Sequence, residues 1–232
     1  LAAFAQLPLP HAPYLFFMGV GEFSIIKDVP YKGKEVSYYV EKQYAPVAKK
    51  IFGNTPEMIK FFSEKLGVDY PWAKYAQIVG RDYVSGAMEN TTAVIFGEFM
   101  QKTKRELMDD GLTNEKVVMH EMFHQWFGDL VTCGSWEDIW LNEGFATYLE
   151  GLTREHFPSQ VQKQWYDWKF EKINQVVEYP DGTVKVDDTT SVNRVFDGRL
   201  SYAKGAYLLH MLRWKLGNEH FFAGVRQYLN DL

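Results

Sequence analysis

Two histidines and a glutamate in the middle of the chain have the types and spacing of a metal site. His120, Glu121 and His124 form an H-E-x-x-H pattern, and Glu143 follows at the nineteenth position after His124 in a second segment with helical character. Four residues of an α-helix turn by about 400°, so histidines at positions i and i+4 project from one face, one turn apart. The pattern therefore predicts a helix that presents two imidazoles to one metal ion.

Zinc suits this set of donors, because it binds neutral imidazole nitrogen and carboxylate oxygen. Its catalytic sites use three protein ligands and leave the fourth position to water. We expect His120, His124 and Glu143 to hold one zinc ion per chain. Glu121 points about 100° away from His120 around the helix, which is the position for a general base that activates water.

A helix with two surface histidines would show the same spacing, so the surroundings decide between the two readings. Apolar residues enclose the motif on nearly all sides in VVMHEMFHQWF, which is typical of a buried helix. Buried histidines beside a buried carboxylate are costly unless something satisfies them. The surroundings therefore favour a metal site.

Length and composition limit the classes of function. The chain has 232 residues, of which 46% are hydrophobic, enough for a core in one domain or two small lobes. A formal net charge of −5 without a basic stripe does not favour nucleic acid as a partner. One cysteine excludes an internal disulfide. No apolar run reaches the roughly 20 residues of a membrane helix, and we expect both ends to be cuts in a longer protein, which leaves the compartment open.

The segments that must position these residues are rich in strands in the first half and helical in the second. This order predicts an α+β fold. We expect a strand over residues 13–28 that pairs with a strand over 35–41, and short strands over 75–79 and 93–96. A helical stretch over 44–66 should break before Pro56, with Thr55 capping the second helix.

The helices of the second half include both metal-binding segments. Thr113 or Asn114 is expected to cap the H-E-x-x-H helix, and Gly128 to end it. The helix with the third ligand should run from about Asn142 to before Pro158. Three more helices are expected over residues 159–177, 201–216 and 218–229.

Three motifs together resemble the gluzincin zinc aminopeptidases, the family of alanyl and leucyl aminopeptidases. They are HEMFHQWFGDLVT, the glutamate of WLNEGFATYLE with eighteen residues between it and the second histidine, and GAMEN at 86–90. The resemblance covers essentially the whole chain. It implies a thermolysin-like catalytic domain with a small sheet-containing lobe over residues 1–112 and a helical lobe over 113–232. The family's flanking domains would be absent from this chain.

The resemblance also implies roles for residues that the zinc motif does not explain. Glu89 would bind the free α-ammonium of a peptide by a charge-assisted hydrogen bond. Tyr202, in a Y-x-K-G pattern, would donate its hydroxyl to the developing oxyanion. Glu150 and Asp138 are candidates to orient the zinc-bound histidines, or are ordinary capping or solvated carboxylates. The residues implied to line the substrate backbone are Gly86, Ala87, Met88 and Asn90.

The function implied is hydrolysis of the N-terminal residue from peptides. A gluzincin endopeptidase would share the zinc site but would have no reason for GAMEN. Epoxide hydrolase activity occurs in one branch of the family, and the motif of that branch resembles GGMEN. This chain has Ala87 at the second position of the motif. A non-catalytic or weakly active zinc-binding fragment is the third alternative. Tyr83, Met88 and residues of the flanking domains would decide which first side chain is preferred.

Overall fold

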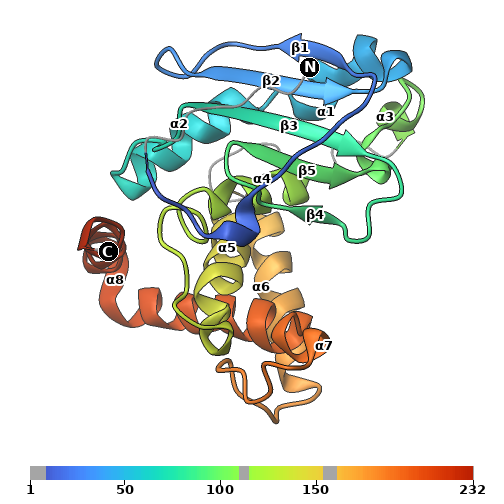
Figure 1. Ribbon diagram of the computed structural model, residues 1–232. Helices are drawn as coiled ribbons and strands as arrows, with labels where there is room; N and C mark the ends of the chain where they lie inside the picture. Colours follow the sequence, from blue (N-terminus) through green and yellow to red (C-terminus); the bar gives the residue numbers. More distant parts are fainter. Residues whose placement is uncertain (1–8, 110–114, 154–160, 232) are drawn as a thin grey trace. The chain divides into compact units, whose positions relative to one another are not determined.

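The computed structural model describes residues 9–109, 115–153 and 161–231. The chain divides into two compact units, Leu1–Gln125 and Trp126–Leu232, and Figure 1 shows the order of the elements along the chain. The first unit contains the β-sheet and the second is helical, so the predicted α+β class is confirmed. We expected the boundary after residue 112, and the H-E-x-x-H helix belongs instead to the unit that contains the sheet.

A five-stranded sheet with the order β1-β2-β3-β5-β4 forms the framework of the first unit. β2, β3 and β5 run parallel, and β1 and β4 pair antiparallel at the two edges. Residues 75–79 of β3 are all buried, as expected for a central parallel strand that is covered on both faces. The strands are β1 (Ser24–Lys27), β2 (Glu35–Val40), β3 (Lys74–Gly80), β4 (Ala87–Met88) and β5 (Ala93–Gly97).

The predicted strands over 35–41, 75–79 and 93–96 are confirmed as β2, β3 and β5, but the strand predicted over 13–28 is wrong except at its end. Pro13–Leu15 forms a 3-10 turn, and pairing with β2 begins only at Ser24. Proline has no N–H to give to a sheet and favours the first position of a turn. The apolar run was therefore a poor guide to strand length here.

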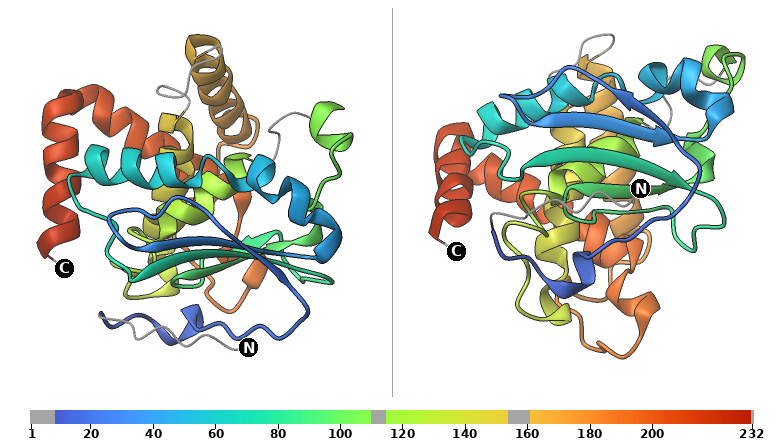
Figure 2. Two further views of the ribbon diagram at one scale, coloured as in Figure 1. Left: turned by 90° about the horizontal axis from the view of Figure 1, so that it is seen from above. Right: turned by 45° about the horizontal axis from the view of Figure 1, so that its top comes forward.

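Helices α1 (Ala48–Phe52), α2 (Thr55–Leu66) and α4 (Glu115–His124) lie on one face of this sheet (Figure 2). The short α3 (Glu106–Asp109) follows β5. The predicted break before α2 is present, but the capping role of Thr55 is wrong. Its hydroxyl donates instead to Oε1 of the buried Gln77 at 2.8 Å.

α4 ends at His124, before the Gly128 that we expected to end it. The backbone N–H of Gln125 still donates to the Met122 carbonyl at 3.1 Å. The carbonyl of Gln125 accepts from the indole Nε1 of Trp72 at 2.9 Å, so a side chain of the same unit caps the end of the helix. The expected caps at the other end, Thr113 and Asn114, lie outside the described residues.

The second unit is built around α5 (Trp140–Thr153), whose residues from Asn142 onward are all buried. The predicted helix over 159–177 is confirmed as α6 (Val161–Val177) within the described residues. The two helices predicted over 201–216 and 218–229 are the two arms of α8 (Gly205–Asp231), which Gly217 breaks with φ 78° and ψ 166°. The other elements of the unit are the 3-10 helix η4 (Trp136–Asp138), α7 (Val192–Val195) and a π-helix, η5 (Gly198–Lys204).

The π-helix is a correction to the prediction for the second unit, because the first arm of α8 begins at Gly205 and not at Ser201. Asp197 precedes η5 and accepts from the backbone N–H groups of Arg199 and Leu200, both at 2.9 Å.

In the described part of the chain, no helix is both long enough and apolar enough to cross a membrane.

Candidate metal centre and substrate site

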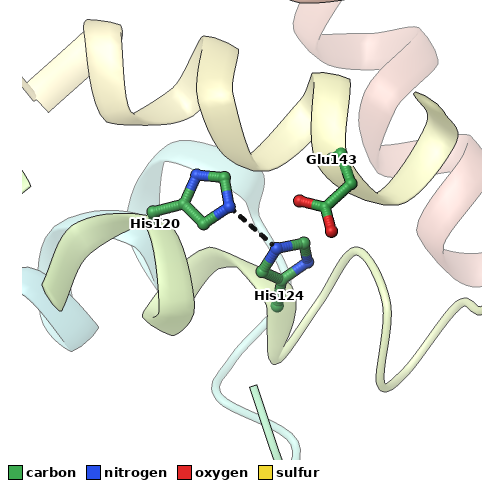
Figure 3. A group of neighbouring side chains, drawn as sticks. All are labelled: His120, His124 and Glu143. Atoms are coloured by element: carbon green, nitrogen blue, oxygen red, sulfur yellow. Dashed lines mark hydrogen bonds between the residues drawn. The ribbon is translucent and has the colours of Figure 1, made fainter. Parts of the chain in front are cut away.

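His120 and His124 face each other from successive turns of α4 (Figure 3). Their Nε2 atoms are 3.1 Å apart, and the ring planes are 77° from parallel. His124 is only 1% exposed. Two imidazole nitrogens at this distance allow one cation to take a lone pair from each ring. The geometry predicted from the i, i+4 spacing is present.

Glu143 lies in the first turn of α5 and is 5% exposed. Together with His120 and His124, drawn beside it in Figure 3, it completes a set of residues that could hold a metal ion. Two neutral imidazoles and a carboxylate are the donors of a catalytic zinc site. The residues present therefore fit zinc.

A second group of ligand atoms lies entirely within the first unit. One oxygen of Glu89, one of Glu121 and a ring nitrogen of His124 lie within 4.8 Å of one another. Glu89 and Glu121 are each 6% exposed. Two carboxylates brought together away from water favour a positive charge beside them. The same group contains the expected general base and the expected amine-binding residue.

Glu89 follows directly on β4, the last strand of the sheet order. β4 pairs with β5 on its inner side, and Gly97 N–H donates to the Gly86 carbonyl at 2.9 Å. Among the described residues, no strand pairs with the outer side of β4. Ala87 and Met88 thus form a sheet edge of the kind to which an extended peptide adds. Asn90 is buried and donates through Nδ2 to the Leu15 carbonyl at 3.3 Å.

Tyr83 lies near both carboxylates of this group. Burial raises the pKa of its phenol, and the negative charges of Glu121 and Glu89 raise it further. All three effects disfavour the phenolate. Tyr83 therefore presents a neutral hydroxyl close to the residues expected to handle the substrate.

The second unit carries Tyr202, which lies in the π-helix η5 and is half-buried. π-helices are rare and occur frequently at functional sites. Lys204 of the same π-helix donates through Nζ to the Gly182 carbonyl at 2.6 Å and to the Pro180 carbonyl at 3.3 Å. The π-helix is thus hydrogen-bonded to the loop between α6 and α7. Glu150 is buried on α5 and Asp138 lies in η4, and their orienting roles stay predictions.

Sequence reasoning missed two features of this region. The first is the side chain of Gln125, which is completely buried and bonded to the segment after β4. A polar residue directly after His124 in an apolar stretch was the available signal. The second is the close approach of Gly144 to Gly205, where a Cβ on Gly144 would lie 3.0 Å from a backbone carbon.

Comparison with known proteins gives a consistent family. Residues 51–232 match the model of the peptidase family M1 domain. Human glutamyl aminopeptidase is 31% identical over 95% of this chain and 24% of its own length. The probable aminopeptidase 2 of Sulfurisphaera tokodaii is also 31% identical, over 94% of this chain and 28% of its own length. The chain thus spans about a quarter of the length of these curated relatives.

Among solved structures, the fold is similar to an M1 zinc metallopeptidase mutant from Deinococcus radiodurans, crystallised with a Tyr-Ser-Ala substrate. The TM-score is 0.73 and the sequences are 24% identical, over 91% of this chain and 45% of the other. The two chains thus share a fold over nearly all of the sequence given.

Proposed function

Since the chain belongs to peptidase family M1, we propose that it is the catalytic part of a zinc aminopeptidase, which removes the N-terminal residue of peptides. His120, His124 and Glu143 would hold the zinc. When bound, zinc lowers the pKa of a coordinated water and polarises a scissile carbonyl. The remaining steps belong to residues of this chain.

The observation that supports the proposal most strongly is the pair of buried carboxylates in the first unit. Glu89 and Glu121 have oxygens within 4.8 Å of each other and of a His124 ring nitrogen. Two unit charges at that distance repel by roughly 3.5 kcal/mol at an effective dielectric constant of about 20. An α-ammonium beside them offsets this repulsion, whereas an N-acetylated terminus brings no charge. The arrangement therefore favours substrates with a free amine.

In the proposed reaction, Glu89 binds the α-ammonium and the outer edge of β4 aligns the peptide backbone. This places the first peptide bond, and no later one, at the reacting position. Glu121 takes a proton from the attacking water and delivers it to the leaving amine as the C–N bond breaks. Tyr202 donates its hydroxyl to the carbonyl oxygen as negative charge develops there.

Hydrolysis of leucyl arylamide, free and N-acetylated in parallel, tests the proposal on protein of known zinc content. We expect cleavage of the free substrate alone, lost with a chelator and restored by zinc. Glu121→Gln should keep the zinc but lower turnover by about 10²–10⁴-fold, because a general base is removed. Glu115→Gln, at the start of the same helix, is the matched control and should keep its activity.

The other outcomes distinguish the alternatives. Equal cleavage of the acetylated substrate would contradict the role of Glu89 and would indicate an endopeptidase. An active Glu121→Gln protein would refute the assignment of the general base. One zinc per chain without any cleavage would indicate a zinc-binding fragment that needs the rest of a longer protein.

A further inference from the structure

The side chain of Gln125 connects the end of the H-E-x-x-H helix to the segment that carries Glu89. Gln125 directly follows His124 and is 0% exposed. Its Nε2 donates to the Glu89 carbonyl at 2.9 Å, and its Oε1 accepts from the Thr92 N–H at 3.2 Å. Its own carbonyl accepts from Trp72 Nε1 at 2.9 Å. One residue thus bonds the segment after β4 at two points while its backbone is held at the helix end.

These contacts require an amide side chain. One partner is a carbonyl, which needs a donor, and the other is an N–H, which needs an acceptor. The two partners therefore fix which atom of the Gln125 amide is nitrogen and which is oxygen. The hydroxyl of Tyr70 is a further donor to Oε1, at 3.1 Å. An apolar side chain of the same length would leave the buried Glu89 carbonyl and Thr92 N–H without this partner.

The segment held by Gln125 has a strained backbone. Thr92 has φ 68°, which is unfavourable for a β-branched residue. Such a conformation persists only where surrounding contacts enforce it. Gln125 holds the Thr92 N–H, Ala76 donates to the Thr92 carbonyl at 2.9 Å, and Ala93 closes the turn by donating to Asn90 at 3.0 Å. The position of Glu89 therefore depends on contacts from outside its own segment.

We propose that Gln125 is a positioning residue that fixes Glu89 relative to the metal-binding helix, so that the amine-binding carboxylate and His124 form one rigid element. The inference rests on the proposed function, in which Glu89 binds the α-ammonium of the substrate. Gln125 is not one of the residues grouped as possible metal ligands, and in the proposal it acts only through Glu89. Its loss should weaken the preference for a free amine and leave metal binding intact.

Two zinc-directed probes separate these effects on the zinc-loaded chain. Leucine hydroxamate carries a free α-amine, and 4-methylpentanoic hydroxamate is the same molecule without it. The ratio of their dissociation constants, measured by calorimetry, reports amine recognition without any need for turnover. We expect Gln125→Met to lower the preference for the amine at least about tenfold, with zinc content and affinity for the amine-free probe unchanged.

Gln77→Met is the matched control. Gln77 is also a fully buried glutamine of the first unit, on β3, and its Oε1 accepts from Thr55. Its replacement should cost stability in a similar way but leave the preference for the amine as in the wild type. Gln125→Asn is the second test if Gln125→Met does not fold. It keeps the amide but shortens the side chain by one methylene, and it should show the same loss of preference for the amine.

An unchanged preference in folded Gln125→Met or Gln125→Asn would overturn the inference. It would also be overturned if both probes and zinc weakened together, because that result indicates a general structural role. A wild-type chain with no preference for the amine would refute the proposed role of Glu89 and the inference that rests on it. That outcome is recognised before any substitution is made.

Discussion

The close contact between α5 and the start of α8 makes Gly144 a sharp test of how the third metal ligand is positioned. A Cβ on Gly144 would lie 3.0 Å from the carbonyl carbon of Gly205 and 3.1 Å from its Cα. Non-bonded carbons pack at about 3.5–4.0 Å, so the two backbones would have to separate by roughly 0.5 Å. Both opposing atoms belong to the backbone, so no side-chain rotation relieves the clash. Glu143, one residue earlier, would move with α5.

The expected free-energy change has two opposing parts. Overpacking in a close-packed region costs roughly 1–3 kcal/mol, while glycine to alanine inside a helix gains up to about 1 kcal/mol. Gly144→Ala should therefore lower the free energy of unfolding by about 0–3 kcal/mol. Gly224→Ala is the control, because Gly224 lies within α8 and its Cβ would meet no atom within 4 Å. The free energy of unfolding of Gly224→Ala should rise by up to about 1 kcal/mol, because only the higher helix propensity of alanine acts there.

Urea unfolding of the zinc-free chain measures this difference without a contribution from metal binding. In thermal unfolding, each kcal/mol corresponds to about 2–4 °C in Tm for a chain of this size. Gly144→Ala should also bind zinc more weakly than Gly224→Ala, because only the first substitution moves Glu143. Equal stability and equal zinc affinity of the two variants would refute the reasoning.

Two further predictions concern the first unit. Thr92→Gly should raise the free energy of unfolding by about 1 kcal/mol, since glycine adopts a φ of 68° without the cost borne by threonine; urea unfolding that shows no gain would contradict this strain. Burial of the Asp28 carboxyl acts to raise its pKa, but hydrogen bonds from Tyr38, the Val29 N–H and Lys49 outweigh burial and hold the pKa below its usual value. The stability that Asp28 contributes is therefore present above its unfolded pKa of about 3.9 and is lost as pH falls through the lower folded pKa. Asp28→Asn should flatten the loss of stability below about pH 4, and an unchanged slope in urea unfolding would contradict the assignment.

The parts of the site that were predictable depend on local geometry. The two histidines face each other because they are four residues apart on one helix, and this follows from the helical repeat alone. The central strands were recognised because their apolar residues are contiguous, as burial on both faces requires. The edge position of Ala87 and Met88 followed from the family resemblance and not from the residues themselves.

The parts that were not predictable depend on partners distant in the sequence. Thr55 has the pattern of a helix cap, but its hydroxyl is taken by Gln77 on β3. The end of α4 is set by the indole of Trp72, so the glycine signal at Gly128 was misleading. The π-helix around Tyr202 depends on loop carbonyls that Lys204 contacts, and no periodicity in the sequence indicates such contacts.

The two units fix their chemical groups by different physical means, and this difference gives separable phenotypes. In the first unit, Glu89 and His124 are coupled through the hydrogen bonds of one buried amide, Gln125. In the second unit, Glu143 and the helix start after Tyr202 are held at a glycine-to-glycine backbone contact. A hydrogen bond is lost without a change in volume, whereas a backbone contact responds to a single methyl group. Substitutions at Gln125 should therefore alter recognition of the substrate amine at constant zinc affinity, and those at Gly144 should alter zinc affinity first.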